Sequence, residues 1–542
     1  MWLLRLDGGG QFSLVEFTGN IPPYAILSHT WGPDSEEVTY EDIINGTGRD
    51  KIGYQKIRFC GSQASKDGLQ YFWIDTCCID KKSSAELTES INSMFEWYRR
   101  AAVCYVALGD LSPGCVLTRE LGDCRWFKRG WTLQELLAPI QVQFFDSTWI
   151  FIGSRDSLVG LISKITGIAA EFVAEGRLES ASVAIKMSWA AQRETKRIED
   201  RAYSLLGIFD VNMSLIYGEG MKAFRRLQEE IIKRNNDLTI FAWEGWNYNM
   251  TPLISPIATS PAMFTESFDI SQYTADFAEF SITNKGLLLS NDIPLRSMDT
   301  VTGDGKRVVS YLVYLGFGQR EVRGIYLRKI GPNLFCRDGH HRLLNLVGDD
   351  METRTYEVKE TCILLNPTAA LDAALKFRSQ GIHVPFDTSF DLRHAYPQML
   401  WDETDRMYLR PKRYVWADFP MVLVMEFKLT LHHGTIWLAV LCHHLSHGPV
   451  LKIFSQDQYH EEFDIISQAR YRHEGIHVHE LDLQARSIRA MGNTITVKVN
   501  DQYYRIAVAL RSESLQTFVG PVPVSTVYFT IDGRESQRLQ RV

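Results

Sequence analysis

One short segment of the chain concentrates side chains that can do chemistry. Residues Arg125–Pro139 (RWFKRGWTLQELLAP) contain two tryptophans, three cations and a single acid, Glu135. Pro139 ends the helix predicted over residues 131–138, whose leucines form a buried side. A carboxylate among apolar neighbours can stabilise a developing positive charge in a partly dry pocket. The alternative is a surface glutamate paired with a nearby arginine, which is a common and weak interaction.

Polar side chains also follow two predicted strands. The apolar run Tyr24–Ser28 predicts a buried strand, and the aromatic run Tyr71–Thr76 predicts a second. In open α/β sheets, ligands bind beyond the carboxyl ends of the strands. The alternatives are a structural histidine after the first strand and a loop-capping aspartate after the second. The candidate ligand-contacting residues at these ends are Ser28, His29, Trp31 and Asp75.

Helices and strands alternate through the first part of the chain. Helices are predicted over residues 52–67 and 85–100, and a third strand over 103–108. This order indicates βαβ units and a mainly parallel sheet, so that the strand ends meet at one crevice. Shorter strands follow at 141–145 and 149–153, and further helices at 158–165, 182–192, 198–209 and 221–235.

The pattern of predicted elements changes after residue 236, from alternating helices and strands to strands. Short β-rich runs separated by turn signals occur at 280–289, 307–317, 323–327, 356–365, 422–429, 435–441, 494–499 and 503–509. Such runs are typical of a β-sandwich or barrel-like domain. We therefore expect an α/β domain over residues 1–236 and a β-rich accessory domain over 237–542.

Composition limits the classes of partner. The net charge of -7 gives no overall basic field to attract nucleic acid. Nine cysteines, two of them adjacent at Cys77-Cys78, indicate reduced thiols in an intracellular protein. The sequence shows neither the apolar length of a signal peptide nor that of a membrane span. We expect a cytoplasmic protein.

Two groups of residues invite a metal interpretation. Cys77-Cys78 lacks a CxxC spacing, and the histidines of the segment 432–447 have irregular spacing that fits a polar-ended hairpin. We therefore expect no metal and no cofactor.

Six motifs occur in order from about residue 22 to 236. They are YAILSHTWG (24–32), WIDTCCIDK (73–81), SINSM (90–94), RGWTLQELLAP (129–139), EDRAYSLLGI (199–208) and YGEG (217–220). Together they resemble the fungal heterokaryon incompatibility (HET) domain family. This family is associated with vegetative incompatibility, a programmed cell death that follows fusion of unlike fungal strains.

HET domains are in turn similar to TIR domains. The TIR pattern has a first strand ending in Ser, a second ending in Ile-Asp, and a later Trp-x-x-x-Glu-Leu segment; Ser28, Asp75 and Trp131–Leu136 correspond. This resemblance implies a TIR/flavodoxin-like sheet over about 22–170 with a helical extension. Catalytic TIR domains cleave NAD at the nicotinamide–ribose bond with the acid of that segment, which is Glu135 in this chain.

The resemblance assigns roles to further residues. NAD cleavage passes through an oxocarbenium-like transition state, which one carboxylate can stabilise without a metal or a second acid. Trp31, Trp126 or Trp131 would stack on the nicotinamide or adenine ring, and Arg125 or Arg129 would hold the pyrophosphate. Core packing is the alternative for each tryptophan.

Three hypotheses follow. The first is a cell-death effector that hydrolyses NAD and is gated by self-association, with an unknown protein trigger. The second is a non-enzymatic, oligomerising signalling module of a cell-death or innate-immunity pathway. The third is a different hydrolase that uses His29 or Cys77 as nucleophile or base.

Overall fold

The computed structural model describes residues 1–7, 11–245, 252–272, 278–301, 307–318, 321–347, 353–356, 361–379, 381–409, 423–432, 434–445, 448–456 and 492–536. The chain forms two compact units, each described by itself below. The first comprises residues 1–246, 257–274 and 315–323, and the second comprises 247–256, 275–314 and 324–542.

A seven-stranded mixed sheet forms the centre of the first unit, in the order β2-β1-β4-β3-β5-β6-β7. The four inner strands, β4, β3, β5 and β6, pair in parallel, whereas β1, β2 and β7 pair antiparallel. The predicted mainly parallel sheet therefore needs correction to a mixed one. The strands are β1 (Trp2–Leu6), β2 (Phe12–Glu16), β3 (Tyr24–His29), β4 (Tyr71–Trp73), β5 (Val103–Ala107), β6 (Val142–Phe145) and β7 (Phe151–Ser154).

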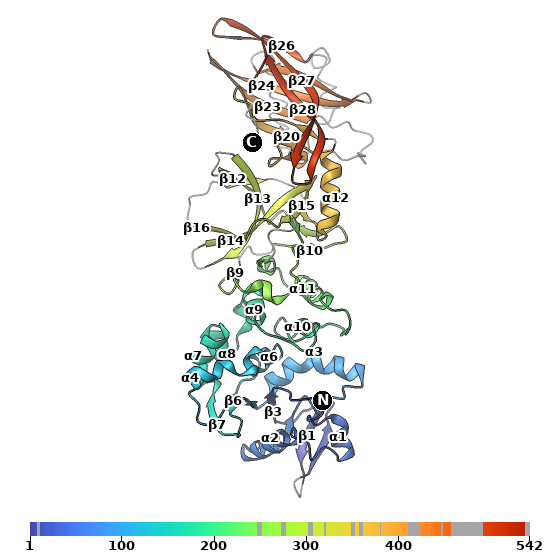
Figure 1. Ribbon diagram of the computed structural model, residues 1–542, viewed down its shortest axis with the longest axis vertical. Helices are drawn as coiled ribbons and strands as arrows, with labels where there is room; N and C mark the ends of the chain where they lie inside the picture. Colours follow the sequence, from blue (N-terminus) through green and yellow to red (C-terminus); the bar gives the residue numbers. More distant parts are fainter. Residues whose placement is uncertain are drawn as a thin grey trace. The chain divides into compact units, whose positions relative to one another are not determined.

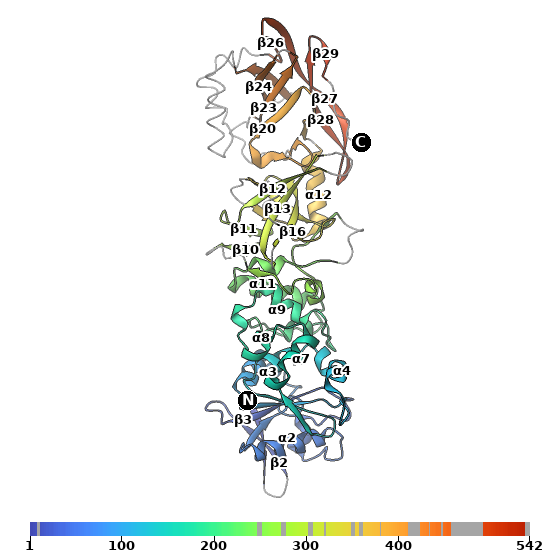
Figure 2. The same ribbon diagram turned by 90° about the vertical axis from the view of Figure 1, so that its left-hand side faces the viewer.

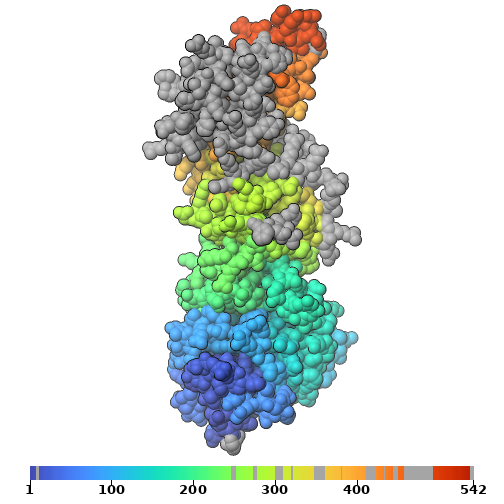
Figure 3. Space-filling view, turned by 180° about the vertical axis from the view of Figure 1, so that it is seen from behind, coloured from blue at the N-terminus to red at the C-terminus, as the bar shows by residue number. Residues whose placement is uncertain are grey.

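Helices cover both faces of this sheet. α2 (Tyr54–Lys66) lies on one face, and α3 (Ser84–Arg100) and α6 (Thr132–Leu137) lie on the other (Figure 1, Figure 2). The Ser83 side chain accepts a hydrogen bond from the Glu86 amide and so caps the start of α3. β3 is buried along its whole length. Figure 3 shows the outer surface of the unit, coloured from dark blue at the N-terminus to green.

The rest of the first unit is mostly short helices. The sequence pattern predicted a helix over 198–209, but only four residues of it are helical, and turns follow. These turns bring Gly207 directly against Phe95: a Cβ at Gly207 would lie 2.0 Å from the Phe95 Cβ. The helices are α1 (Tyr40–Asn45), α4 (Leu117–Glu120), α5 (Arg125–Lys128), α7 (Arg155–Thr166), α8 (Ala170–Glu175), α9 (Val183–Ala190), α10 (Asp200–Tyr203) and α11 (Lys222–Arg234), with 3-10 turns at Leu121–Asp123, Leu178–Ser180, Leu238–Phe241 and Pro261–Phe264.

Residues beyond 236 complete the first unit. Gln228 on α11 is buried, and its amide exchanges two hydrogen bonds with the backbone of Ala258, at 2.9 and 3.0 Å. The Ser182 hydroxyl donates to the Ile270 carbonyl at 2.5 Å. The segment 257–274 is thus bonded to α9 and α11, and the boundary expected at residue 236 stays a prediction.

The second unit is rich in sheet. One sheet has the order β10-β11-β18-β15-β14-β13-β12-β17, a second β21-β22-β19-β28-β27-β26, and a third β20-β23-β24-β25. Most of the β-rich runs predicted from the sequence fall within the longer strands of this unit. The predicted strand 280–289 is instead a hairpin of two short strands. The longer strands are β12 (Leu295–Val301), β13 (Arg307–Phe317), β14 (Glu321–Gly331), β15 (Leu334–Asp338), β20 (Phe390–Tyr396), β23 (Leu423–Leu431), β24 (Gly434–Leu445), β25 (Gly448–Ser455), β26 (Thr494–Val499), β27 (Gln502–Thr517) and β28 (Gly520–Ile531).

Short elements complete this unit. The helix α12 (Pro367–Arg378) begins at Asn366, whose side chain accepts hydrogen bonds from two backbone amides. The remaining strands are β8 (Leu253–Ile254), β9 (Ser271–Gln272), β10 (Phe280–Ile282), β11 (Leu287–Leu289), β16 (Leu344–Val347), β17 (Thr353–Tyr356), β18 (Thr361–Ile363), β19 (Ile382–His383), β21 (Trp401–Asp402), β22 (Met407–Tyr408) and β29 (Arg534–Glu535), with a 3-10 turn at Gln398–Leu400; β9 belongs by contacts to the first unit.

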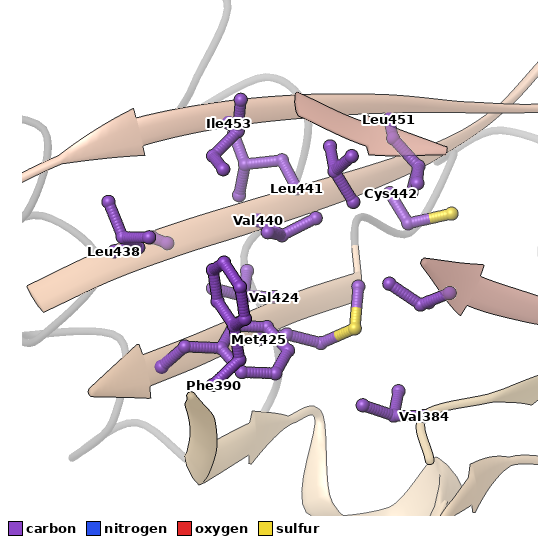
Figure 4. Close-up of a cluster of buried hydrophobic side chains, with 14 of the residues drawn as sticks. Val384, Phe390, Val424, Met425, Leu438, Val440, Leu441, Cys442, Leu451 and Ile453 are labelled. Atoms are coloured by element: carbon purple, nitrogen blue, oxygen red, sulfur yellow. The ribbon is translucent and has the colours of Figure 1, made fainter. Parts of the chain in front are cut away.

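An apolar core joins two sheets of the second unit. Phe390, Met425 and Val440 pack among the strands drawn in Figure 4. Phe390 also stacks on Phe529 of β28, with ring centroids 4.0 Å apart. The region is therefore sheet-rich as expected, and its sandwich or barrel-like form stays a prediction.

Two findings concern metals and membranes. Within the described ranges, no group of three or more His, Cys, Asp or Glu side chains could hold a metal ion. His433 and His447 of the segment considered above lie outside the described residues. No helix in the described part of the chain is long and apolar enough to cross a membrane.

Candidate functional site

A cavity of about 600 Å³ opens at the ends of β3 and β4. Its walls come from these strand ends, from α3, from the segment 129–135 and from a charged segment at 194–200. Its polar lining residues include His29, Trp31, Asp34, Glu37, Asp75, Lys81, Arg129, Trp131, Glu135, Glu194, Thr195, Lys196, Arg197, Asp200 and Tyr217. The volume lies in the range of small-molecule sites.

Glu135, on α6, is a buried acid of this lining. Its residue exposure is 7%, and the Ser28 hydroxyl donates a short hydrogen bond to its Oε2. Ser28 Oγ in turn accepts a hydrogen bond from Trp126 Nε1 at 2.7 Å. Burial raises the pKa of Glu135 to about 8, although the Ser28 hydrogen bond acts in the opposite direction. This carboxyl group is therefore mostly protonated at neutral pH.

Two arginines lie near Glu135 and lower its pKa, but less than burial raises it. The Arg193 guanidinium donates from Nη1 to the Arg129 carbonyl at 2.9 Å and to the Thr132 hydroxyl at 3.0 Å. Burial lowers the pKa of Arg193 to about 10, and the nearby Glu135 opposes this. Any cation that enters the cavity would meet a carboxyl group whose ionisation it favours.

A second polar group lies at the strand ends. His29 Nε2 is 2.9 Å from Asp75 Oδ1, and Trp31 Nε1 donates to Asp75 Oδ2 at 2.8 Å. Burial acts to raise the pKa of Asp75, but these hydrogen bonds and the charges of His29 and Lys81 lower it well below its usual range. His29 is 5% exposed, and its Nδ1 has no hydrogen-bond partner among the residues that the structure describes. Asp75 is thus a charged acid in the same cavity as the largely neutral Glu135.

A charged segment between the helices predicted at 182–192 and 198–209 forms one wall of the cavity. The Gly130 amide donates to the Glu194 carbonyl at 2.8 Å, and the Glu194 amide donates to the Lys128 carbonyl at 2.7 Å. Gly130 permits this contact because a Cβ there would lie 2.6 Å from the Thr195 Cγ2. The run of charges in residues 193–197 gave no signal of this strand-like pairing, since solvated charge runs are common.

Of the nine predicted site residues, six line the cavity: His29, Trp31, Asp75, Arg129, Trp131 and Glu135. Ser28 is fully buried and contacts Glu135 from behind. Trp126 is also fully buried and does not line the cavity. Its position corresponds to the alternative of core packing that was considered for each tryptophan. Arg125 does not line it either; its guanidinium donates to the Thr30 hydroxyl at 3.3 Å.

The arrangement does not favour a cysteine nucleophile. Cys77 is fully buried, and burial raises the pKa of its thiol well above the usual value. The cavity instead combines one raised-pKa acid, one ionised acid and several cations on an α/β scaffold. This defines a class: an α/β domain with a polar, small-molecule-sized cavity at the carboxyl ends of its parallel strands.

Comparison with known proteins finds a family match and a relative for the N-terminal part of the chain. Residues 24–118 match the family "Heterokaryon incompatibility protein (HET)", and residues 222–293 match a domain of unknown function, DUF8212. The chain is 52% identical over 246 residues to "Vegetative incompatibility protein HET-E-1" of Podospora anserina. The N-terminal region of the chain is thus similar to the fungal HET-domain proteins.

The extent of these matches is limited. The aligned region covers 43% of this chain and 18% of the relative. Arg129, Trp131 and Glu135 lie C-terminal to the range that matches the family. No solved structure matches the chain.

Proposed function

We propose that this protein acts in fungal vegetative incompatibility as a cell-death effector that hydrolyses NAD in the Glu135 cavity. The reaction would convert NAD⁺ and water into nicotinamide, ADP-ribose and a proton. The role in incompatibility rests on the HET domain and on the relative's name. The chemistry rests on one observation, the buried carboxyl group of Glu135 behind a polar cavity.

The charge state of Glu135 suits a positively charged substrate. In the free protein the group is mostly neutral at pH 7, because burial raises its pKa to about 8. The pyridinium of NAD⁺ would favour the ionised form, since an opposite charge nearby lowers a carboxyl pKa. The carboxylate would then stabilise the ribosyl cation as nicotinamide leaves. The Ser28 hydroxyl would hold the carboxylate in position.

The strand order supports the TIR-like interpretation. Among the inner parallel strands, the first in sequence, β3, lies between the second, β4, and the third, β5, with β6 beyond. This is the start of the 2-1-3-4-5 order of flavodoxin-like sheets, which bind ligands where the order reverses. β3 carries Ser28 and His29 at that point.

The test is NAD consumption by the purified full-length chain, measured as nicotinamide release. We expect activity in the wild type, a loss of at least about 100-fold in Glu135→Gln, and no change in Glu171→Gln. Glu171 is a matched control because it is an exposed glutamate of α8 in the same unit. For the wild type, kcat/KM should rise with pH towards a plateau above about pH 8.

Cell death gives the biological readout. Cells that express the wild type should lose NAD and die, and cells that express Glu135→Gln should do neither at equal protein levels. Death at constant NAD content would contradict the enzymatic proposal. Activity gated by self-association predicts that specific activity rises with protein concentration, together with a larger species in light scattering.

The second candidate is a non-enzymatic, oligomerising signalling module. It is favoured by the same raised pKa, because a mostly protonated acid in the free protein is not poised for catalysis without a cationic ligand. In that case Glu135→Gln, which keeps the shape of the protonated acid, would leave both ligand binding and cell death intact.

A further inference from the structure

Two cations in the wall of the cavity are positioned by aromatic rings. The Lys81 ammonium lies 3.8 Å from the centroid of the Trp31 ring, and the Arg197 guanidinium lies 4.4 Å from that of Tyr217. Such contacts hold a cation over a ring face without neutralising it. Its hydrogen-bond donors therefore remain available to a ligand.

Each ring is fixed in turn by a buried or half-buried acid. Trp31 Nε1 donates to Asp75, and the Tyr217 hydroxyl donates to Asp200 Oδ1 at 3.1 Å. The cavity thus contains two stacks of the same kind, in which an acid holds the edge of a ring and the ring face holds a cation. Because each acid is occupied by the ring, and by His29 in the case of Asp75, neither forms an ion pair with its cation.

Arg129 adds a third cation to this lining. Its backbone is held by the Arg193 guanidinium and by pairing with Glu194. Within the part of the chain that the structure describes, no carboxylate lies within 4.0 Å of the charged groups of Lys81, Arg129 or Arg197.

Two other acids of the lining are each paired with a lysine. Asp34 pairs with Lys196 at 2.7 Å, and Glu37 pairs with Lys56. Glu194 is exposed at the rim. The charge of Asp75 acts on Lys81, and Asp200 interacts with Arg197, but neither pair is in direct contact as an ion pair. The cavity therefore offers one ligand three cations whose donors are not held by a carboxylate within the described residues, which favours a ligand with more than one negative charge.

We propose that Lys81, Arg129 and Arg197 form an anion subsite that binds the diphosphate of a nucleoside diphosphate group. The proposal rests on the proposed function, because NAD contains a diphosphate group. It identifies the diphosphate as the part of the substrate that these three cations bind. Arg125, the other arginine expected at the pyrophosphate, has no part in it because it does not line the cavity.

The test is calorimetric titration of the full-length chain with ADP, adenosine and inorganic pyrophosphate. We expect ADP to bind at least about tenfold more tightly than adenosine or pyrophosphate, and its affinity to fall as salt is added. Arg197→Gln and Lys81→Gln should each weaken ADP binding about tenfold and leave adenosine binding unchanged. Lys81→Arg should restore binding relative to Lys81→Gln.

The control is Arg225→Gln on α11, since Arg225 pairs with Glu229 on the helix surface and does not line the cavity. Lys81 and Arg197 are exposed, so their substitution should leave the melting temperature within about 2 °C. The proposal is overturned if ADP does not bind, if it binds no more tightly than adenosine or pyrophosphate, or if the glutamine variants bind it within twofold of the wild type.

The outcome is separable from that of the proposed function. ADP binding that depends on Lys81 and Arg197, in a protein that does not cleave NAD, would support the anion subsite and refute the proposed NAD hydrolysis. NAD cleavage with equal KM in the wild type and both glutamine variants would support the proposed NAD hydrolysis and refute the anion subsite.

Discussion

The protonation of Glu135 should be measurable as a pH dependence of stability. Its ordinary pKa is 4.5, and burial raises the value in the folded protein to about 8. Between these two pH values the folded chain holds a proton that the unfolded chain has lost. The free energy of unfolding then decreases with rising pH by about 1.4 kcal/mol per unit. The loss is complete once the pH exceeds the folded pKa.

Glu135→Gln removes this titration while keeping a neutral group of the same shape. Its amide oxygen can accept the Ser28 hydrogen bond, as Oε2 of the glutamate does. From pH 6 to pH 9 the wild type should therefore lose about 2 to 3 kcal/mol relative to the variant. All other titrating groups are common to both proteins and cancel in the difference.

The assay is urea denaturation of the full-length proteins at pH 6 and pH 9, followed by tryptophan fluorescence. Glu171→Gln, with its exposed carboxylate, should differ from the wild type by less than about 0.5 kcal/mol at either pH. If the difference between wild type and Glu135→Gln is the same at both pH values, Glu135 titrates as a solvated acid. The raised pKa, and the mechanism that uses it, would then be wrong.

Three further predictions concern packing and buried charge. Ser28→Ala should cost about 1 to 3 kcal/mol in urea denaturation, because Trp126 Nε1 and Glu135 both lose a buried partner, and Ser28→Thr should cost less if the hydroxyl is what matters. Arg378→Met should lower the unfolding free energy of the second unit by about 3 to 5 kcal/mol, because Asp402 and Asp405 lose a buried guanidinium 2.5 and 2.8 Å away; an equal stability would show that these acids are protonated. Gly207→Ala should cost about 1 to 3 kcal/mol through overpacking against Phe95, whereas Gly160→Ala, with open space around it, should not destabilise.

Much of the first unit could be predicted from periodicity and strand endings. The stripe of apolar residues after Ser83 predicted α3, and the apolar run after Tyr24 predicted the buried strand β3. The hairpin β1–β2 was missed because its strands carry little alternation and β2 is only half-buried. The predicted helix 198–209 was wrong beyond Tyr203, where turns bring Gly207 against Phe95 in a tertiary contact that the local apolar pattern does not reveal.

The sequence predicted the site residues that lie at strand ends. It did not predict the cavity wall that residues 194–200 supply, because this segment is distant in the sequence. Asp75 and Glu135 occur in motifs whose position in a βαβ order points to one crevice. Arg197 reaches the cavity only because its segment pairs with the backbone at Gly130, and a single sequence carries no sign of that pairing. The placement of Trp126 in the core instead of the cavity likewise depends on its hydrogen bond to Ser28.

The way the chain returns to the first unit has a consequence for how such proteins are dissected and recombined. A cut at residue 236 would remove one partner of the two hydrogen bonds between Gln228 and Ala258 and of the bond from Ser182 to Ile270. A fragment that ends there would expose the apolar faces of α9 and α11 and would be prone to aggregate, which in a toxicity screen can imitate activation. A segment for gene fusion or for exon-scale shuffling should instead extend at least to about residue 274, and residues 315–323 also belong to this unit.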